Sequence, residues 1–148
     1  VETCIAKGLS VIEGNAETEL GQFPNKSFDY VVLSQTLQAF YNPVTVLEHL
    51  LRIGKASIVS IPNFGYWKVR ANLLFFGRMP ITKSLPYKWF DTPNLHMCTI
   101  KDFYELCESK RIKMEKIVGI NNNKTSSIHG NNIKLKNLIS EVGIFLIR

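Results

Sequence analysis

The chain has 148 residues, of which 45% are apolar and 20% are charged, and its formal net charge is +6. This composition is typical of a globular protein rather than a disordered chain, and the longest apolar runs are too short to span a membrane. The three cysteines, Cys4, Cys98 and Cys107, form no CxxC pair and are odd in number, which argues against a disulfide framework or a zinc site. We expect one soluble, cytoplasmic domain over residues 1–148, and the start at Val1 rather than Met suggests part of a longer protein.

The first half of the chain alternates predicted strands with polar turns. Residues 9–13 are predicted to form a short strand, and residues 28–33 form a second one with the β-branched and aromatic content of a buried strand. This second strand ends abruptly at Ser34, Gln35 and Thr36. In an α/β sheet, ligands bind outside the carboxyl ends of the strands, so we expect binding chemistry at these polar residues.

A well-marked helix and a further strand follow. Asn42 is a suitable N-cap and Pro43 a suitable first helical residue, while Gly54 provides a C-terminal stop. Residues 56–61 then read as another buried strand, which makes a strand–helix–strand crossover of parallel strands. The predicted architecture is therefore α/β.

In the last third of the chain, the sequence predicts a helix and then two antiparallel strands that extend the sheet. Thr99 and Asp102 have the spacing of a helix-capping pair, and Cys98 is placed to pack on Phe103. Residues 114–120 and 142–147 are predicted strands that pair antiparallel at the end of an otherwise parallel sheet. We expect the polar residues 121–127 to form a flexible loop, and residues 135–138 to form one helical turn.

Residues 64–98 are rich in aromatic and basic side chains and are punctuated by prolines. Within this segment, which we call the cap, the basic residues outnumber the single acidic residue, Asp91. Such a mixture can form a platform on which single-stranded nucleic acid stacks, or it can be a packed lid over the sheet. We favour the packed lid, because the aromatics are interleaved with aliphatic residues and prolines.

The histidines give no clear catalytic or metal-binding pattern. His49 falls within a predicted helix, His129 lies in a polar loop, and His96 forms only an isolated HxC with Cys98. We expect no metal site, since further ligands at suitable spacing are missing. Asp29 stands at the start of its strand, away from the carboxyl end, and is expected to be structural.

Several stretches of this sequence resemble the MetW family, which is associated with methionine biosynthesis and belongs to the class I methyltransferase-like proteins. The resemblance runs nearly end to end. It is carried by residues 11–16, 28–38, 42–43, 51–54 and 60–67, and above all by residues 77–83, 85–87, 89–94 and 96–103. The last group contains the proline-punctuated cap, which distinguishes the family from other methyltransferase-like proteins.

The resemblance implies a Rossmann-like sheet of seven strands that is mostly parallel, with a terminal antiparallel strand. This chain would hold strands three to seven, and strands one and two would lie upstream of it. Because those strands separate strand three from strand four in the family, we expect residues 9–13 to lack a partner and the Tyr30 strand to have an open edge. We also expect the isolated chain to be poorly stable.

The resemblance further implies a site for S-adenosylmethionine or S-adenosylhomocysteine, which would be incomplete in this chain. Asn15 would accept a hydrogen bond from the adenine amino group, and the backbone of Ala16 would meet the adenine ring. Ser34 and Gln35 would border the sulfonium end of the ligand. The alternative for Asn15 is a purely structural role in a turn after a strand.

Two functions from different classes follow from the resemblance. In the first, the protein is an accessory to homoserine O-acyltransferase, and the cap residues Trp67, Arg78, Tyr87 and Trp89 form the partner surface, since these residue types dominate interface hot spots. In the second, it is a methyltransferase that acts on a small molecule, and the cap is a substrate lid. Binding of nucleic acid through the basic cap is a third and weaker interpretation.

Overall fold

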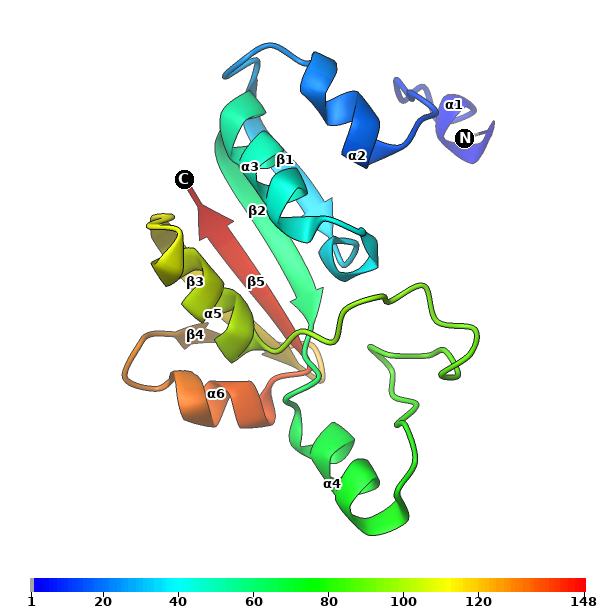
Figure 1. The fold of residues 1–148 in the computed structure, drawn as a ribbon, viewed down its shortest axis with the longest axis vertical. Helices are drawn as coiled ribbons and strands as arrows, with labels where there is room; N and C mark the ends of the chain where they lie inside the picture. Colours follow the sequence, from blue (N-terminus) through cyan, green and yellow to red (C-terminus); the bar gives the residue numbers. More distant parts are fainter. Residues whose placement is uncertain (1) are drawn as a thin grey trace.

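The computed structural model describes residues 2–148, and its strands form one five-stranded sheet in the order β1-β2-β5-β3-β4 (Figure 1). The strands are β1 (Phe28–Ser34), β2 (Gly54–Pro62), β3 (Met114–Asn121), β4 (Lys124–Ile128) and β5 (Val142–Ile147). β1 and β2 pair in parallel, whereas the β2–β5, β5–β3 and β3–β4 pairs are antiparallel. β1, β2 and β3 therefore run in the same direction, with the antiparallel β5 between β2 and β3. The predicted α/β fold with an antiparallel terminal strand is confirmed.

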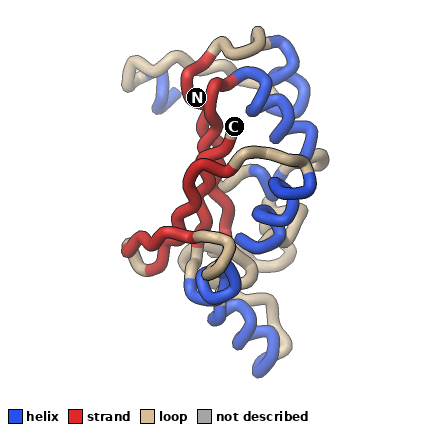
Figure 2. Tube along the Cα trace, turned by 90° about the vertical axis from the view of Figure 1, so that its left-hand side faces the viewer, coloured by secondary structure: helices blue, strands red, loops and turns tan. Residues whose placement is uncertain are grey.

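Most of the helices lie on one side of this sheet (Figure 2). The longer helices are α3 (Pro43–Ile53), α4 (Trp67–Phe76), α5 (Ile100–Ser109) and α6 (Ile133–Ile139). Short helical turns are α1 (Glu2–Ile5), α2 (Ala16–Glu19), η1 (Leu20–Gln22) and η2 (Leu37–Ala39). The prediction that residues 28–33 form a buried strand is wrong for one face of β1, where Tyr30 and Val32 are 59% and 63% exposed. Side chains at alternate positions point to the same face of a strand, and no described helix covers this one.

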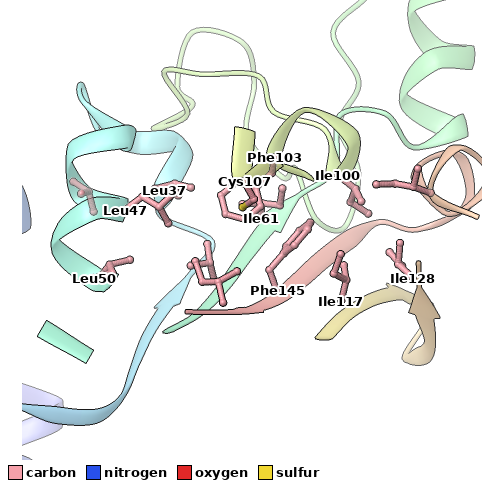
Figure 3. Close-up of a cluster of buried hydrophobic side chains, with 14 residues drawn as sticks. Leu37, Leu47, Leu50, Ile61, Ile100, Phe103, Cys107, Ile117, Ile128 and Phe145 are labelled. Atoms are coloured by element: carbon pink, nitrogen blue, oxygen red, sulfur yellow. The ribbon is translucent and has the colours of Figure 1, made fainter. Parts of the chain in front are cut away.

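The core lies between the sheet and helices α3 and α5 (Figure 3). α3 contributes Leu47 and Leu50, which are buried at helical spacing, and α5 contributes Phe103. The Phe103 ring meets the ring of Phe145 from β5 edge to face, with centroids 4.6 Å apart. An edge-to-face pair of this kind stabilises a core by about 1 kcal/mol beyond its buried area.

Local sequence signals set the limits of both core helices. Asn42 is the N-cap residue of α3 and Pro43 its first residue, as predicted, but within the described chain the Asn42 side chain makes no capping hydrogen bond. Gly54 ends α3, and a Cβ atom there would lie 2.7 Å from Cγ2 of Val31. A glycine is therefore needed where α3 turns into β2 beside β1.

The capping signal of α5 is also confirmed. The Thr99 side chain accepts a hydrogen bond from the backbone N–H of Asp102, and the Asp102 carboxylate accepts one from the backbone N–H of Thr99. The reciprocal pair satisfies two donors that would otherwise lack a partner at the helix start. Cys98 packs against the main core just before this cap.

Residues 9–13 differ from the prediction, because they have no strand structure. Ile12 is 74% exposed and Leu9 58% exposed. A strand needs a neighbour to satisfy its backbone, and in the described part of the chain β1 pairs with β2 alone. The expected open edge of the Tyr30 strand is therefore present, and the sequence of residues 9–13 is not sufficient to form a strand without a partner.

Residues 121–127 also differ from the prediction, because they form a β-hairpin instead of a flexible loop. β3 continues to Asn121 and β4 begins at Lys124, with Asn122 and Asn123 in the turn. These two residues have φ values of 47° and 63°, which is the left-handed conformation that a tight two-residue hairpin turn requires and that asparagine tolerates. The predicted helical turn at 135–138 is confirmed and extends over all of α6.

No helix formed by residues 2–148 is both long enough and apolar enough to cross a membrane.

Candidate functional site

The carboxyl ends of β1 and β2 form a hollow with a volume of about 360 Å³, which we call the carboxyl-end hollow. Ser34 pairs with Ser60 in the β1–β2 register, so both strands end at the same edge. Gln35 follows with φ of 50°, and its N–H donates to the carbonyl oxygen of Ser60 at 2.9 Å and to its Oγ at 3.1 Å. The structure thus brings Ser34 and Gln35 together in one hollow and leaves both side chains exposed.

The other side of this hollow comes from distant parts of the sequence. Its lining includes Lys83 from the cap, Asn122 from the β3–β4 turn, and Glu141, which is the residue before β5. These residues could not be predicted from the sequence, because a lone lysine, asparagine or glutamate carries no local signal. The available signal was the predicted antiparallel pairing of residues 114–120 and 142–147, which brings the end of one strand beside the start of the other.

Asn15 and Ala16 stand outside the carboxyl-end hollow, at the start of α2. The Asn15 Oδ1 atom accepts a hydrogen bond from the backbone N–H of Glu17 at 2.9 Å, which is an N-cap arrangement. Glu17 in turn accepts from the backbone N–H of Asn42 at 2.8 Å. This contact anchors α2 beside the start of α3. In the structure, the Asn15 side chain caps the start of α2.

Gln38 is a further residue that sequence analysis did not single out. It is 4% exposed, and its Nε2 donates to the carbonyl oxygen of Gln35 at 2.7 Å and to Asn94 Oδ1 at 3.0 Å. The carbonyl oxygen of Gln38 accepts from the backbone N–H groups of Leu95 and His96, both at 3.0 Å. Gln38 therefore joins the end of the cap to the segment that follows Ser34. A glutamine soon after a predicted strand was the signal available for it.

The cap is less packed than the sequence suggested. Tyr66, Val69 and Leu85 form a small buried cluster with Phe64 against it. The other large aromatics are exposed: Trp67 at 48%, Phe75 at 75%, Phe76 at 70%, Tyr87 at 53%, Trp89 at 73% and Phe90 at 61%. The prediction of a packed lid is wrong for these residues, because α4 projects from the end of the sheet and the cap forms no helix or strand after α4 (Figure 1).

Two of the exposed aromatics line a second hollow of about 290 Å³, which we call the cap cavity. Tyr87 and Trp89 line it together with Phe64 and Met79, and Asn94 adds a polar group. Trp67 lines a different hollow, and Arg78 is an exposed residue after α4. Of the four predicted cap residues, the structure therefore brings Tyr87 and Trp89 together and places Trp67 and Arg78 elsewhere.

Asp29 and the histidines lie where the sequence suggested. Asp29 near the start of β1 accepts a hydrogen bond from Lys55 at 2.7 Å, and this contact lowers the pKa of the Asp29 carboxyl group. Both side chains are exposed, at the end of β1 opposite Ser34. Within residues 2–148, no three His, Cys, Asp or Glu side chains are grouped as metal ligands would be.

Cys107 is buried and Cys98 is partly buried, and their thiols give a testable pH dependence. Burial raises the pKa of both Cys98 and Cys107 to about 12, whereas thiols in an unfolded chain ionise near pH 8.5. Between these values unfolding releases protons, so the free energy of unfolding should fall as the pH rises from about 9 towards 12. Urea unfolding at several pH values measures this fall.

A variant with Cys98→Ala and Cys107→Ala is the control for this prediction. It lacks both of these thiols but keeps Cys4 and every tyrosine and lysine, so its free energy of unfolding should fall less steeply over the same pH range. Equal slopes for the two proteins would mean that these thiols do not stay protonated in the folded state.

Comparison with solved structures shows that the fold of this chain is similar to that of methyltransferases. A SAM-dependent methyltransferase from Thermotoga maritima, described as a possible histamine N-methyltransferase, superposes with a TM-score of 0.67 at 16% identity, covering 99% of this chain and 66% of that protein. A SAM-dependent methyltransferase from Archaeoglobus fulgidus gives a TM-score of 0.60 at 13% identity, covering 99% of this chain and 70% of that one. At these identities the likeness establishes the fold, which is that of the class I methyltransferases.

Comparison of the sequence identifies the family. A bifunctional methionine biosynthesis protein MetXA/MetW from Rhodopirellula baltica is 38% identical over 101 residues, which is 68% of this chain and 16% of that protein. The chain thus corresponds to a small part of this relative. The family model of the methionine biosynthesis protein MetW matches residues 1–147. Over nearly its whole length, the chain belongs to the MetW family.

Proposed function

We propose that this protein acts in methionine biosynthesis as an accessory that binds and activates homoserine O-acyltransferase. The observation that carries the proposal is the bifunctional MetXA/MetW relative, in which a MetW-like segment shares one polypeptide with MetXA. We identify MetXA with the acyltransferase. Functions joined in one chain in one organism are good candidates for association between separate chains in another.

The cap provides a suitable surface for such a partner. Trp89 and Tyr87 are large, exposed aromatic residues beside the cap cavity, and Arg78 is exposed in the same segment. Exposed aromatic side chains next to a cavity are typical of interface hot spots, because the partner can desolvate them and fill the cavity, and arginine is also enriched at hot spots. Trp67, which is about half exposed on α4, extends the proposed surface.

We further propose that S-adenosylmethionine or S-adenosylhomocysteine binds at the carboxyl edge of the sheet. Ser34 and Gln35 would border its sulfonium end, and the segment of Asn15 and Ala16 would meet its adenine ring. Support comes from the methyltransferase fold and from the position of Ser34 and Gln35 at the carboxyl ends of the strands, where open α/β sheets bind their ligands. A cytoplasmic setting fits the three free cysteines.

The proposal is tested by measuring homoserine acylation with the purified acyltransferase, with and without the full-length form of this protein. We expect the acylation rate to rise when the protein is added and to respond when S-adenosylmethionine is titrated in. An unchanged rate, together with no complex in analytical ultracentrifugation, would contradict the accessory function. A higher rate without a response to S-adenosylmethionine would contradict only the proposed ligand.

A second candidate function is methyl transfer from S-adenosylmethionine to a small molecule. It is favoured by the similar solved structures, whose descriptions name SAM-dependent methyltransferases, and by a cap beside the edge where the methyl donor would lie. Incubation of the full-length protein with methyl-labelled S-adenosylmethionine and a panel of small-molecule acceptors distinguishes this function. Catalytic turnover of label would favour it over the accessory function.

A further inference from the structure

A third hollow adjoins the carboxyl-end hollow on the side of α4. Its volume is about 320 Å³, and we call it the aromatic hollow because Tyr66, Trp67 and Phe76 line it. Lys83, Asn122 and Glu141 line both this hollow and the carboxyl-end hollow. These three residues therefore stand at the junction of two hollows, each of a size that accommodates a small molecule.

The two charged residues at this junction have no opposite charge close to them. Among the ion pairs formed within residues 2–148, none involves Lys83 or Glu141, so their charged atoms are more than 4.0 Å from each other as well. An ammonium and a carboxylate that share a hollow without pairing leave room for a ligand that carries both charges. A purely anionic ligand would be repelled by Glu141, and a purely cationic ligand would be repelled by Lys83.

Both positions are fixed by the backbone. The N–H of Glu141 donates to the carbonyl oxygen of Ile120 at 2.8 Å, and its carbonyl oxygen accepts from the N–H of Asn63 at 2.9 Å. Lys83 lies in a turn in which Thr82 and Leu85 exchange backbone hydrogen bonds at 2.9 and 3.2 Å. Leu85 is buried with Tyr66, so this turn is anchored to the rest of the cap. Only the two side chains need to be ordered when a ligand binds.

The aromatic hollow indicates what the rest of the ligand should be. Beyond the charged junction it is lined by Trp67, Phe76 and Ile81, and Lys68 lies over the Trp67 ring at 5.7 Å from its centroid. An apolar side chain would lose its contact with water against these rings, which favours binding, whereas a cationic side chain would be repelled by Lys68, which also lines the hollow.

We infer that the junction of the two hollows binds a free α-amino acid with an apolar side chain. The ammonium group of the ligand meets the Glu141 carboxylate, its carboxylate meets the Lys83 ammonium, and its side chain enters the aromatic hollow. The site is additional to the proposed adenosyl site and does not depend on the acyltransferase.

The inference is tested by titrating L-methionine into the full-length protein and measuring binding by calorimetry. Three other probes separate the contacts: N-acetyl-L-methionine lacks the ammonium group, L-methioninamide lacks the carboxylate, and L-lysine has a cationic side chain. We expect L-methionine to bind about ten-fold more tightly than N-acetyl-L-methionine and L-methioninamide, since a charge-assisted hydrogen bond contributes about that much. L-lysine should bind more weakly than L-methionine because Lys68 repels its side chain. No binding of L-methionine at millimolar concentration would overturn the inference.

Substitutions of Lys83 and Glu141 test which charged group of the ligand each residue binds. Lys83→Gln should weaken L-methionine binding about ten-fold and abolish the preference over L-methioninamide, and Glu141→Gln should abolish the preference over N-acetyl-L-methionine. Lys88→Gln and Glu105→Gln make the same charge changes outside both hollows and should leave binding unchanged. Unchanged unfolding midpoints show that the variants fold. Preferences that survive both site substitutions would overturn the assignment.

A last comparison separates this ligand from the amino-acid end of S-adenosylmethionine. L-methionine is titrated again with S-adenosylhomocysteine present at saturation. We expect its affinity to be unchanged, which places the two ligands in different sites. Competitive displacement would instead mean that Lys83 and Glu141 hold the amino-acid end of the adenosyl ligand, and it would overturn the second site while leaving the proposed function intact.

Discussion

Asn63→Ala is expected to lower the free energy of unfolding by about 3–4 kcal/mol, which is a large part of the stability of an ordinary domain. Asn63 is 1% exposed and follows directly after β2. Its Nδ2 group donates to the carbonyl oxygens of Asn137 and Ser140, both at 2.7 Å. Its Oδ1 accepts from the backbone N–H groups of Gly65 at 2.9 Å and Ile100 at 3.2 Å.

The expected loss is large because four backbone groups lose their partner at once. An alanine at position 63 would leave two carbonyl oxygens near the end of α6 and two N–H groups, at the start of the cap and of α5, without the Asn63 side chain. A buried backbone group without a partner costs about 1–3 kcal/mol, and entry of water reduces the sum. Urea unfolding followed by circular dichroism measures the change.

Asn42→Ala is the matched control, since it makes the same chemical change at an exposed position. Among the described residues, the Asn42 side chain makes no capping hydrogen bond, so this variant should change the free energy of unfolding by less than about 0.5 kcal/mol. Asn63→Asp keeps the acceptor atoms but has no amide donor for the two carbonyl oxygens, and it should also be strongly destabilising. A loss below about 1 kcal/mol for Asn63→Ala would contradict the role of the residue as a structural junction.

Elements specified by neighbouring residues could be predicted from the sequence. The limits of α3 follow from Pro43 and Gly54, and the start of α5 follows from Thr99 and Asp102, because these signals act within one helical turn. Ser34 and Gln35 could be assigned to an edge of the sheet because an apolar run with the composition of a strand ends at them. Each of these inferences needs only the chain within a few residues.

Features that depend on distant partners could not be predicted. Residues 9–13 have a strand-like sequence, but whether they form a strand depends on a neighbour. The exposed cap aromatics were expected to be buried, because hydrophobicity shows that a residue favours burial and not what covers it. Asn63 bonds to residues 74 and 77 positions away, and Lys83 and Glu141 line the same hollow only because of the fold. Such contacts leave no pattern in a single sequence.

Trp89→Ala is expected to weaken the complex with homoserine O-acyltransferase at least about ten-fold while leaving the fold intact. Trp89 is 73% exposed and lines the cap cavity, and its ring meets that of Phe90 edge to face at 5.6 Å. Because so much of the ring is exposed, its removal should lower the free energy of unfolding by at most about 1 kcal/mol. A ring that gains burial only in the complex contributes to affinity and hardly to folding.

The dissociation constant is measured by calorimetry with the purified acyltransferase and the full-length protein. Phe75→Ala is the matched control, because Phe75 is equally exposed at 75% but lies on α4, outside the lining of the cap cavity. If the cavity is the centre of the interface, Tyr87→Ala should resemble Trp89→Ala, whereas Phe75→Ala should bind like the unaltered protein. Equal effects at positions 75 and 89 would indicate contact through general hydrophobicity of the cap. Unchanged affinity in Trp89→Ala would move the interface away from the cavity, since a buried tryptophan cannot be lost from the centre of an interface without cost.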